Sequence, residues 1–222
     1  MIRRLAAVVA VALVAAGAAL GVATPLGPPS GAVVYSSHPI FTWSVPANEE
    51  SDAIYIASKP DTTPEGKFFD ENLVDLDLLT NNEQQWSPSS PLYAGAYWWL
   101  IWSHDRNTFQ SYYSTPSGFT VAPSLTLLLV KTRRYLNLHW LDVTVRWTAN
   151  VHTLTAKVRL LRRGKTVWSR SEGEDNLVGS PGSTTITWYR PRRIKQGTRL
   201  KLQVTLVGGG AKKARALVVR AP

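Results

Sequence analysis

The chain contains no cysteine among its 222 residues. A disulfide, a thiolate metal site and a cysteine nucleophile are therefore all excluded. The usual catalytic signatures are missing as well: there is no Gly-x-Ser-x-Gly elbow, no Gly-x-x-x-x-Gly-Lys-Ser/Thr loop and no His-Glu-x-x-His pair. None of His38, His104, His139 and His152 pairs with another histidine at metal-ligand spacing around a carboxylate. We therefore expect a protein that is not an enzyme and has neither a metal nor another cofactor.

The acidic run from Asp70 to Asp77 is a poor calcium site, although it superficially resembles a calcium loop. Val74 stands where an EF-hand needs an oxygen ligand, and Asp75 stands where it needs glycine. We expect a solvated acidic edge here. The neighbours His104 and Asp105 are likewise interpreted as two solvated loop residues.

The N-terminus has the features of an export signal. Arg3 and Arg4 precede an apolar stretch from Leu5 to Leu20, and the small residues 21–23 suit a signal peptidase. Counted from Leu5 to Ala23 the apolar stretch is 19 residues long, which is also long enough to span a bilayer, although its many alanines make it a weak permanent anchor. We therefore expect residues 1–23 to be a signal peptide or a membrane anchor, which places the rest of the chain outside the cytoplasm in either case.

Charge is divided unevenly along the chain. Residues 31–122 carry three basic and eleven acidic side chains, whereas residues 123–222 carry twenty basic and four acidic ones. Such an asymmetry supports two domains with different partners. We expect a Pro/Gly-rich linker at 24–31, a first domain at 32–122 and a basic second domain at 123–222, with the junction at Ala122-Pro123-Ser124.

Short alternating segments, and no sustained helical period, follow the linker. In the first half, strands are expected at 32–36, around Phe41 and Trp43, and at 54–57, 97–103 and 111–121. Residues 59–91 are rich in loop formers, with Leu73–Thr80 as either a short helix or an edge strand. Phe41 and Trp43 are expected to share one face, and so are Phe119 and Val121.

Three residues of this half carry a family resemblance. Trp43 lies on the expected second strand, and Leu92 and Tyr97 flank Ala94-Gly95. With this pattern residues 33–121 resemble a fibronectin type III domain, apart from a long acidic insertion between Pro60 and Pro91. The resemblance implies an antiparallel β-sandwich in which the tyrosine hydroxyl ties a loop to the following strand. No Arg-Gly-Asp tripeptide is present, so no integrin-type site is implied.

The second half alternates again, and seven or so short strands in about 100 residues are typical of a sandwich. Leu125, Leu127 and Leu129 are expected on one face, and the turn at residues 162–165 predicts a hairpin. The half resembles an immunoglobulin-like or degenerate fibronectin-like domain. The predicted fold class is therefore all-β, with two tandem antiparallel β-sandwiches after an N-terminal hydrophobic signal helix.

An aromatic strand supplies the first candidate binding residues. If Tyr97, Trp99 and Ile101 face the core, then Trp98, Leu100 and Trp102 form an apolar stripe on the outer face, and an exposed stripe of that size usually marks a contact. The interpretation we favour is coverage by the 60–91 insertion. The alternatives are the second domain or a partner protein, and a sugar stacked on Trp98 or Trp102.

The second candidate set is basic. The densest groups are Arg162, Arg163 and Lys165 in the expected turn, and Arg190, Arg192, Arg193 and Lys195 after the strand that carries Ile186 and Trp188. A solvated outer face is the plain interpretation, but the charge exceeds what solubility needs and attracts polyanions. Because export argues against nucleic acid, the expected partners are anionic wall polymers, a membrane surface, or an acidic protein surface, including the first domain of another copy.

These features favour a non-catalytic exported protein, secreted or held at the cell surface, that has a binding or structural role in the cell envelope. It would dock electrostatically through its basic second domain, and its first domain would contact a protein. The runner-up hypothesis is an accessory carbohydrate-binding module that uses Trp98 and Trp102. A hydrolase would need a polar site that only the tertiary structure can bring together.

Overall fold

The computed structural model describes residues 22–222 except 81–82, 176–177 and 179. Residues 1–21, which hold nearly all of the expected signal or anchor segment, lie outside the described residues. Within the described part the regular structure is all strand apart from one 3₁₀ turn, η1 (Asp70–Asn72). No helix there has the length and apolar character needed to cross a bilayer. The all-β prediction is confirmed for these residues.

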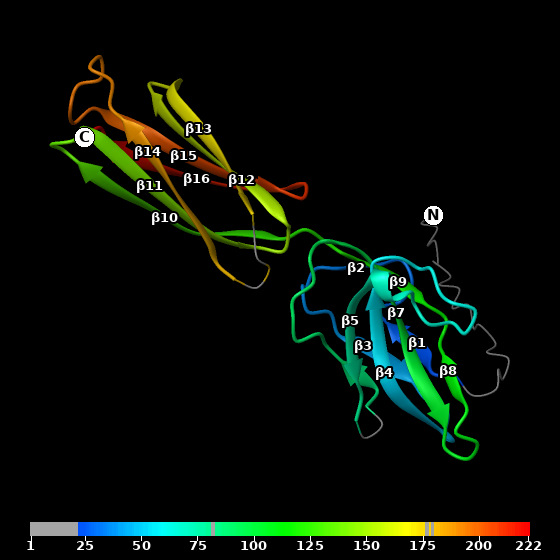
Figure 1. The fold of residues 1–222 in the computed structure, drawn as a ribbon. Coiled ribbons are helices and arrows are strands. Elements are labelled where there is room, and N and C mark those ends of the chain that lie inside the picture. The colour runs from blue at the N-terminus through cyan, green and yellow to red at the C-terminus, as the bar shows by residue number, and fades with distance from the viewer. Residues whose placement is uncertain (1–21, 81–82, 176–177, 179) are drawn as a thin grey trace, which may run out of the picture.

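Two sheets build the first half (Figure 1). The smaller has the order β1 (Thr24–Gly27), β3 (Phe41–Ser44) and β6 (Gln85–Trp86). The larger has the order β2 (Ala32–Val34), β9 (Ser117–Val121), β7 (Gly95–Asp105), β4 (Glu49–Ala57) and β5 (Leu73–Leu78), and β8 (Ser111–Tyr113) pairs with β7. Of the two alternatives for Leu73–Thr80, the structure therefore has the edge strand.

The core of this half contains side chains from both sheets, as strand alternation predicts. Phe41 and Trp43 point inward from β3, and Tyr97, Trp99 and Ile101 point inward from β7. The Phe41 ring meets the Trp99 ring edge-on, with 5.0 Å between their centroids. The expected inward faces of these strands are confirmed.

The predicted tyrosine tie is also present. The Tyr97 hydroxyl donates a hydrogen bond to the Tyr93 carbonyl at 2.9 Å. This bond fixes the loop that precedes β7 to the strand itself. The residues that carry the fibronectin type III resemblance are thus structural residues, because Trp43, Leu92 and Tyr97 all belong to the core.

The expected linker at 24–31 differs from the structure. Its first part forms β1, which pairs antiparallel with β3, and the chain then crosses to the other sheet and forms β2. Because the chain changes sheets without reversing direction, β2 runs parallel to β9, with Ala32 opposite Phe119. The larger sheet is therefore mixed rather than purely antiparallel.

The second half also has two sheets (Figure 1). One has the order β10 (Leu125–Tyr135), β11 (Trp140–Ala149) and β14 (Gly182–Tyr189). The other has the order β13 (Lys165–Asp175), β12 (Thr153–Arg162), β15 (Arg199–Gly208) and β16 (Ala211–Arg220). One core of buried residues from both sheets includes Val143, Val145 and Trp147 on β11 and Leu200 and Leu202 on β15.

The predicted face of β10 is wrong at Leu129. The register with β11 shifts between Leu127 and Leu129, which indicates a β-bulge. The extra residue reverses the alternation beyond it, so Leu129 is 39% exposed and Val130 is buried instead. The alternation of residues in the sequence does not reveal where a strand contains an inserted residue, so it could not predict this change of face.

The hairpin expected at residues 162–165 is confirmed. Arg162 pairs with Lys165, and both Arg163 and Gly164 between them have positive φ, at 49° and 80°. Two positive-φ residues form the type I′ turn, whose twist matches that of the flanking strands. The β15–β16 hairpin turns in the same way through Gly209 and Gly210, with φ of 53° and 83°.

Candidate functional site

The basic groups that are separate in the sequence meet at one end of the second half. The connections between β10 and β11, β12 and β13, and β14 and β15 all lie at the end where β16 also finishes, away from the first half (Figure 1). We call this end the basic pole. Its cationic residues are Arg133, Arg134, Arg162, Arg163, Lys165, Arg190, Arg192, Arg193, Lys195, Arg199 and Arg220.

Strand register and loop hydrogen bonds bring the groups of the pole together. Leu161 pairs with Lys201, which places the β12–β13 turn beside the start of β15. The amide of Gly197 donates to the Ala221 carbonyl at 2.9 Å, so the β14–β15 loop lies against the end of the chain. The same loop begins beside the β10–β11 connection, because the amide of Arg190 donates to the His139 carbonyl at 2.8 Å.

Arg190 holds this loop in place. Its Nη1 donates to the Ile194 carbonyl at 2.6 Å, and its Nη2 lies 3.0 Å from Nδ1 of His139. Since a guanidinium can only donate, Nδ1 of His139 accepts that hydrogen bond. Ile194 itself is 2% exposed and closes the end of the core. Of the basic residues predicted to bind, Arg190 is therefore mainly a positioning residue.

The other predicted basic residues are free to meet a partner. Arg162, Arg163, Lys165, Arg192, Arg193 and Lys195 are all exposed. Among the described residues, no ion pair involves a cation of the pole. Their charges are therefore not neutralised within this part of the chain, and they add to a single positive field.

Acidic side chains of the second half lie elsewhere. Glu172, Glu174 and Asp175 are on the later part of β13, which ends next to the first half. Asp142 is the exception, because it lies opposite Arg133 in the β10–β11 register, and one of its oxygens accepts a hydrogen bond from the Thr187 hydroxyl at 2.7 Å. The inner end of this half therefore carries both carboxylates and cations, since Lys212 and Lys213 also lie there, whereas the outer end is mainly cationic.

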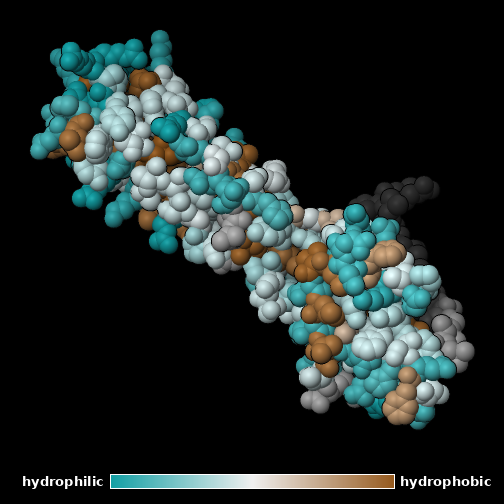
Figure 2. Space-filling model, in the orientation of Figure 1, coloured by the Kyte–Doolittle hydropathy of each residue, from teal (hydrophilic) through white to brown (hydrophobic). Residues whose placement is uncertain are grey.

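An apolar hairpin lies within the basic pole. The connection between β10 and β11 consists of residues 136–139, and its Leu136 and Leu138 are 48% and 53% exposed. Tyr135 and Trp140 pair at its base, with ring centroids 5.3 Å apart. Trp140 in turn meets the exposed ring of Tyr189 edge-on at 5.6 Å. Figure 2 shows hydrophobic patches among the mainly hydrophilic residues of this end.

Sequence reasoning did not identify this hairpin. The signal that was available is the run of leucines and aromatic residues from Tyr135 to Trp140 between two alternating segments. Its position within the basic pole follows only from the pairing of β10, β11 and β14.

Trp98 and Trp102 do not form an open stripe on the outer face of the larger sheet. Leu100 between them is fully buried, in a second cluster on the outer face of the larger sheet that also contains Phe68 from the insertion. Tyr113 of β8 adds to this cover, and its ring centroid lies 6.3 Å from that of Trp102. The interpretation that the 60–91 insertion covers the strand is therefore confirmed in part, with β8 as a contributor that the sequence did not predict.

Coverage leaves each indole only partly exposed. The ring of Trp98 lies over Gly118, where an added Cβ would come within 2.8 Å of the indole nitrogen. A flat platform of two open indoles, which stacking on a sugar would require, is therefore not observed at this face.

His104 has a partner that the sequence did not indicate. Its Nδ1 lies 2.8 Å from both carboxylate oxygens of Asp52 on β4. Asp105, its neighbour in sequence, instead accepts hydrogen bonds from the amides of Asn107 and Thr108 at 2.7 and 2.8 Å and so fixes the following turn. Neither His104 nor Asp52 lines the hollow beside β12 and β13 that is described next.

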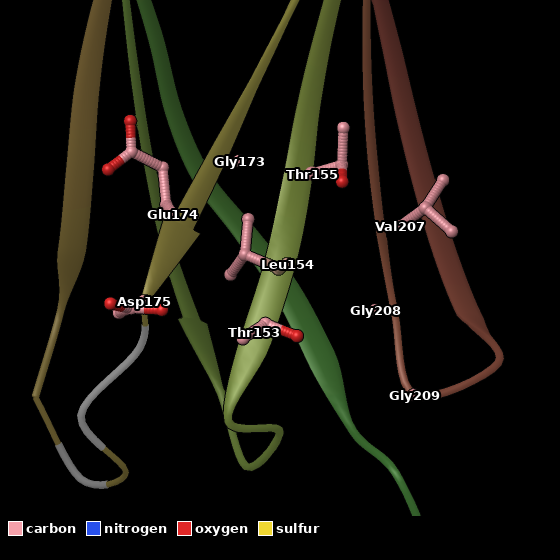
Figure 3. Close-up of a pocket in the computed structure, with 9 residues that line it drawn as sticks. All are labelled: Thr153, Leu154, Thr155, Gly173, Glu174, Asp175, Val207, Gly208 and Gly209. Carbon is pink, nitrogen blue, oxygen red and sulfur yellow. The ribbon is translucent and has the colours of Figure 1, made fainter.

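One hollow lies at the inner end of the second half, between β12, β13 and the β15–β16 hairpin (Figure 3). Its volume is about 330 Å³, and Glu174 and Asp175 are its only ionisable lining residues. Figure 3 shows both carboxylates on β13 next to Gly173, with Gly208 on the other side of β12. The hollow contains no histidine and no lysine that would act on a substrate together with these carboxylates.

The acidic run at 70–77 does not converge on one point. Asp70 pairs with Lys67 at 2.7 Å, and Asp77 accepts a hydrogen bond from the indole nitrogen of Trp86 at 2.8 Å. Burial raises the pKa of Asp75 above its usual value. Within the described residues, no three histidine, aspartate or glutamate side chains are arranged to hold a metal ion.

No protein family model and no curated protein matches this chain. Among solved structures, the chain is similar to the chicken interferon gamma receptor alpha chain, with 9% identity and a TM-score of 0.38 over 90% of this chain and 98% of that one. It is also similar to a DUF3823 family protein from Bacteroides ovatus, with 16% identity and a TM-score of 0.31 over 63% of this chain and 81% of that one.

Proposed function

We propose that this chain is a non-catalytic exported protein of the cell envelope that docks on an anionic surface through the basic pole. The observation that carries the proposal is the convergence of three separate basic segments on one end of the second sandwich. Summed charge of one sign raises the local concentration of polyanions and speeds association with them. Exposed cations without internal partners remain free to provide this attraction.

The position of the pole supports this function. The amide of Ala94 in the first half donates to the carbonyl of Asn150 in the second at 2.6 Å, and the rings of Tyr93 and His152 stack with 3.6 Å between centroids. These contacts are at the end of the second half opposite the pole. The first half therefore leaves the pole uncovered, and its fibronectin type III-like sandwich serves as the arm that carries it.

Export and location rest on the sequence of residues 1–23. A cleaved signal would release the chain outside the cytoplasm, and an uncleaved one would hold it at the membrane. Both cases provide anionic polymers or lipid head groups as partners. The absence of an open indole platform at Trp98 and Trp102 leaves the carbohydrate-binding alternative without structural support.

A matched pair of charge reversals tests the proposal. The test variant is Arg192→Glu/Arg193→Glu at the pole, and the control is Lys212→Glu/Lys213→Glu, which makes the same change in net charge at exposed positions near the β15–β16 turn. Binding of the full chain to phosphocellulose and to sedimented cell envelopes is measured between low and high salt. We expect the pole variant to bind on the order of tenfold more weakly at low salt than the control.

Salt is expected to weaken binding of the unaltered chain steeply, because exposed charge attraction is screened within about 10 Å at 0.1 M ionic strength. Binding that is indifferent to salt would refute electrostatic docking. Equal losses in the two variants would mean that net charge matters and the pole does not, which would also refute the proposal.

A further inference from the structure

We infer that the anionic surface is a lipid bilayer, and that the β10–β11 hairpin inserts Leu136 and Leu138 into it while the arginines around it bind the head groups. This inference rests on the proposed function and names the partner of the same pole. A soluble or wall-bound polyanion is the competing partner, and the experiment below distinguishes the two.

The exposed leucines favour lipid over a polymer in water. Leu136 and Leu138 lie at the tip of a hairpin, and both are about half exposed. A hollow of about 530 Å³ is lined by residues 135–138 of the hairpin. Apolar side chains gain free energy when they leave water, and a hydrated polyanion offers them no apolar phase.

The aromatic residues behind the tip fit the boundary between acyl chains and water. Tyr135, Trp140 and Tyr189 form a continuous edge-to-face row at the base of the hairpin. Tyr189 is 65% exposed, although a tyrosine ring is apolar enough to be buried in a protein core. Tyrosine and tryptophan favour the head-group level of membranes because each has an apolar ring and a polar group that hydrogen-bonds.

Cations surround the tip at the level where head groups would lie. The guanidinium of Arg133 stacks over the Tyr135 ring at 5.0 Å from its centroid, and Arg134 follows it on β10. The β14–β15 loop, with Arg192 and Arg193, is held against the hairpin by the Arg190–His139 contacts. An apolar insertion combined with a cationic rim provides the two signals that stable attachment to an anionic membrane needs.

A fluorescent probe attached to the tip of the β10–β11 hairpin reports its insertion into the bilayer most directly. Because the chain has no cysteine, Asn137→Cys creates a single thiol that an environment-sensitive nitrobenzoxadiazole label can occupy. The same label on Ser171→Cys, an exposed position on β13, is the control. The full chain is mixed with vesicles of phosphatidylglycerol and phosphatidylcholine, with phosphatidylcholine vesicles, or with soluble inorganic polyphosphate. This local readout does not depend on whether residues 1–23 also enter the bilayer.

We expect a blue shift of the tip label, and its quenching by doxyl-labelled lipid, only with the anionic vesicles. The Ser171→Cys label should stay in water in every mixture. A tip label that stays in water on vesicles to which the chain is bound would overturn the inference.

A second pair of variants measures the contribution of the leucines. Leu136→Gln/Leu138→Gln removes the apolar tip, and Leu128→Gln/Leu129→Gln alters two leucines of similar exposure near the other end of β10. We expect the tip variant to bind anionic vesicles roughly 10- to 100-fold more weakly than the unaltered chain, because vesicle binding buries the leucines. Its affinity for polyphosphate should be unchanged, because binding to polyphosphate does not bury them. The control should match the unaltered chain with both probes, with folding of each variant checked by circular dichroism.

The two proposals fail in different ways. If the tip and control variants bind vesicles equally while Arg192→Glu/Arg193→Glu still weakens both vesicle and polyphosphate binding, lipid insertion is wrong and electrostatic docking stands. If Arg192→Glu/Arg193→Glu changes neither vesicle binding nor polyphosphate binding, the proposed function itself is wrong.

Discussion

Asn150 connects the two halves of the chain, and its substitution is a stringent test of the structure. The side chain is 2% exposed. Its Oδ1 accepts a hydrogen bond from the Ser124 amide at 2.6 Å, and its Nδ2 donates to the Ala122 carbonyl at 2.9 Å. Its own carbonyl accepts from the Ala94 amide. One residue thus holds both the connecting segment and the loop that precedes β7.

Asn150→Ala removes both side-chain hydrogen bonds and leaves the Ser124 amide and the Ala122 carbonyl without them. Each buried polar group that loses its partner costs about 1–3 kcal/mol. Because Ser124 is itself exposed and water can reach part of its backbone, we expect a total near the lower end, about 2 kcal/mol. The backbone bond to Ala94 should remain.

Asn150→Asp separates the two bonds. The new carboxylate keeps the acceptor for the Ser124 amide but cannot donate to the Ala122 carbonyl at neutral pH. At low pH the protonated side chain can donate again. We therefore expect its deficit relative to the unaltered chain to shrink as pH falls, whereas the deficit of Asn150→Ala should change little.

Urea denaturation followed by tryptophan fluorescence, fitted with a transition for each half, measures the cost. Amide hydrogen exchange at Ser124 measures the local effect, and protection there should fall in Asn150→Ala. A cost below about 0.5 kcal/mol, or the same pH dependence for both substitutions, would refute the role assigned to this side chain.

Three further substitutions test the described packing. Burial raises the pKa of Glu49, which is 2% exposed, so its folded pKa lies above the unfolded value and stability is lost as pH rises through the folded pKa. Glu49→Gln should therefore raise the free energy of unfolding at neutral pH. Tyr97→Phe removes the hydroxyl bond to the loop before β7 and should cost about 1 kcal/mol. Gly182→Ala would place a Cβ 2.3 Å from the buried Trp147 indole nitrogen and should cost about 3 kcal/mol.

Each of these has its own control in a urea denaturation series. For Glu49→Gln the gain should vanish at acidic pH, and a gain that is independent of pH would contradict the assigned cause. For Tyr97→Phe the amides of residues 93–96 should exchange faster, and unchanged exchange would mean that the hydroxyl does not hold the loop. For Gly182→Ala the comparison is Gly173→Ala, where the added methyl group meets nothing within 4 Å; equal costs would show that the indole is not close-packed there.

Local pattern was sufficient for most of the strands. Alternation placed Phe41 and Trp43 on the core face of their strand, because a strand has a fixed period of two. Turn chemistry placed the 162–165 hairpin, because its geometry requires positive φ at both central residues. Alternation predicted the wrong face for Leu129, because one inserted residue reverses the alternation of side chains there. It also missed strand β1, whose Pro and Gly residues suggested a linker.

The candidate site divides in the same way. The sequence by itself determined that the second half is strongly basic, that it lacks cysteine and the common catalytic motifs, and which short segments are densest in charge. Only the tertiary structure decided that residues 162–165 and 190–195 meet at one end with the Leu136–Leu138 hairpin, because strand pairing joins positions that are far apart in the chain. It also decided that Trp98 and Trp102 are half covered by Phe68 and Tyr113, since burial depends on distant neighbours.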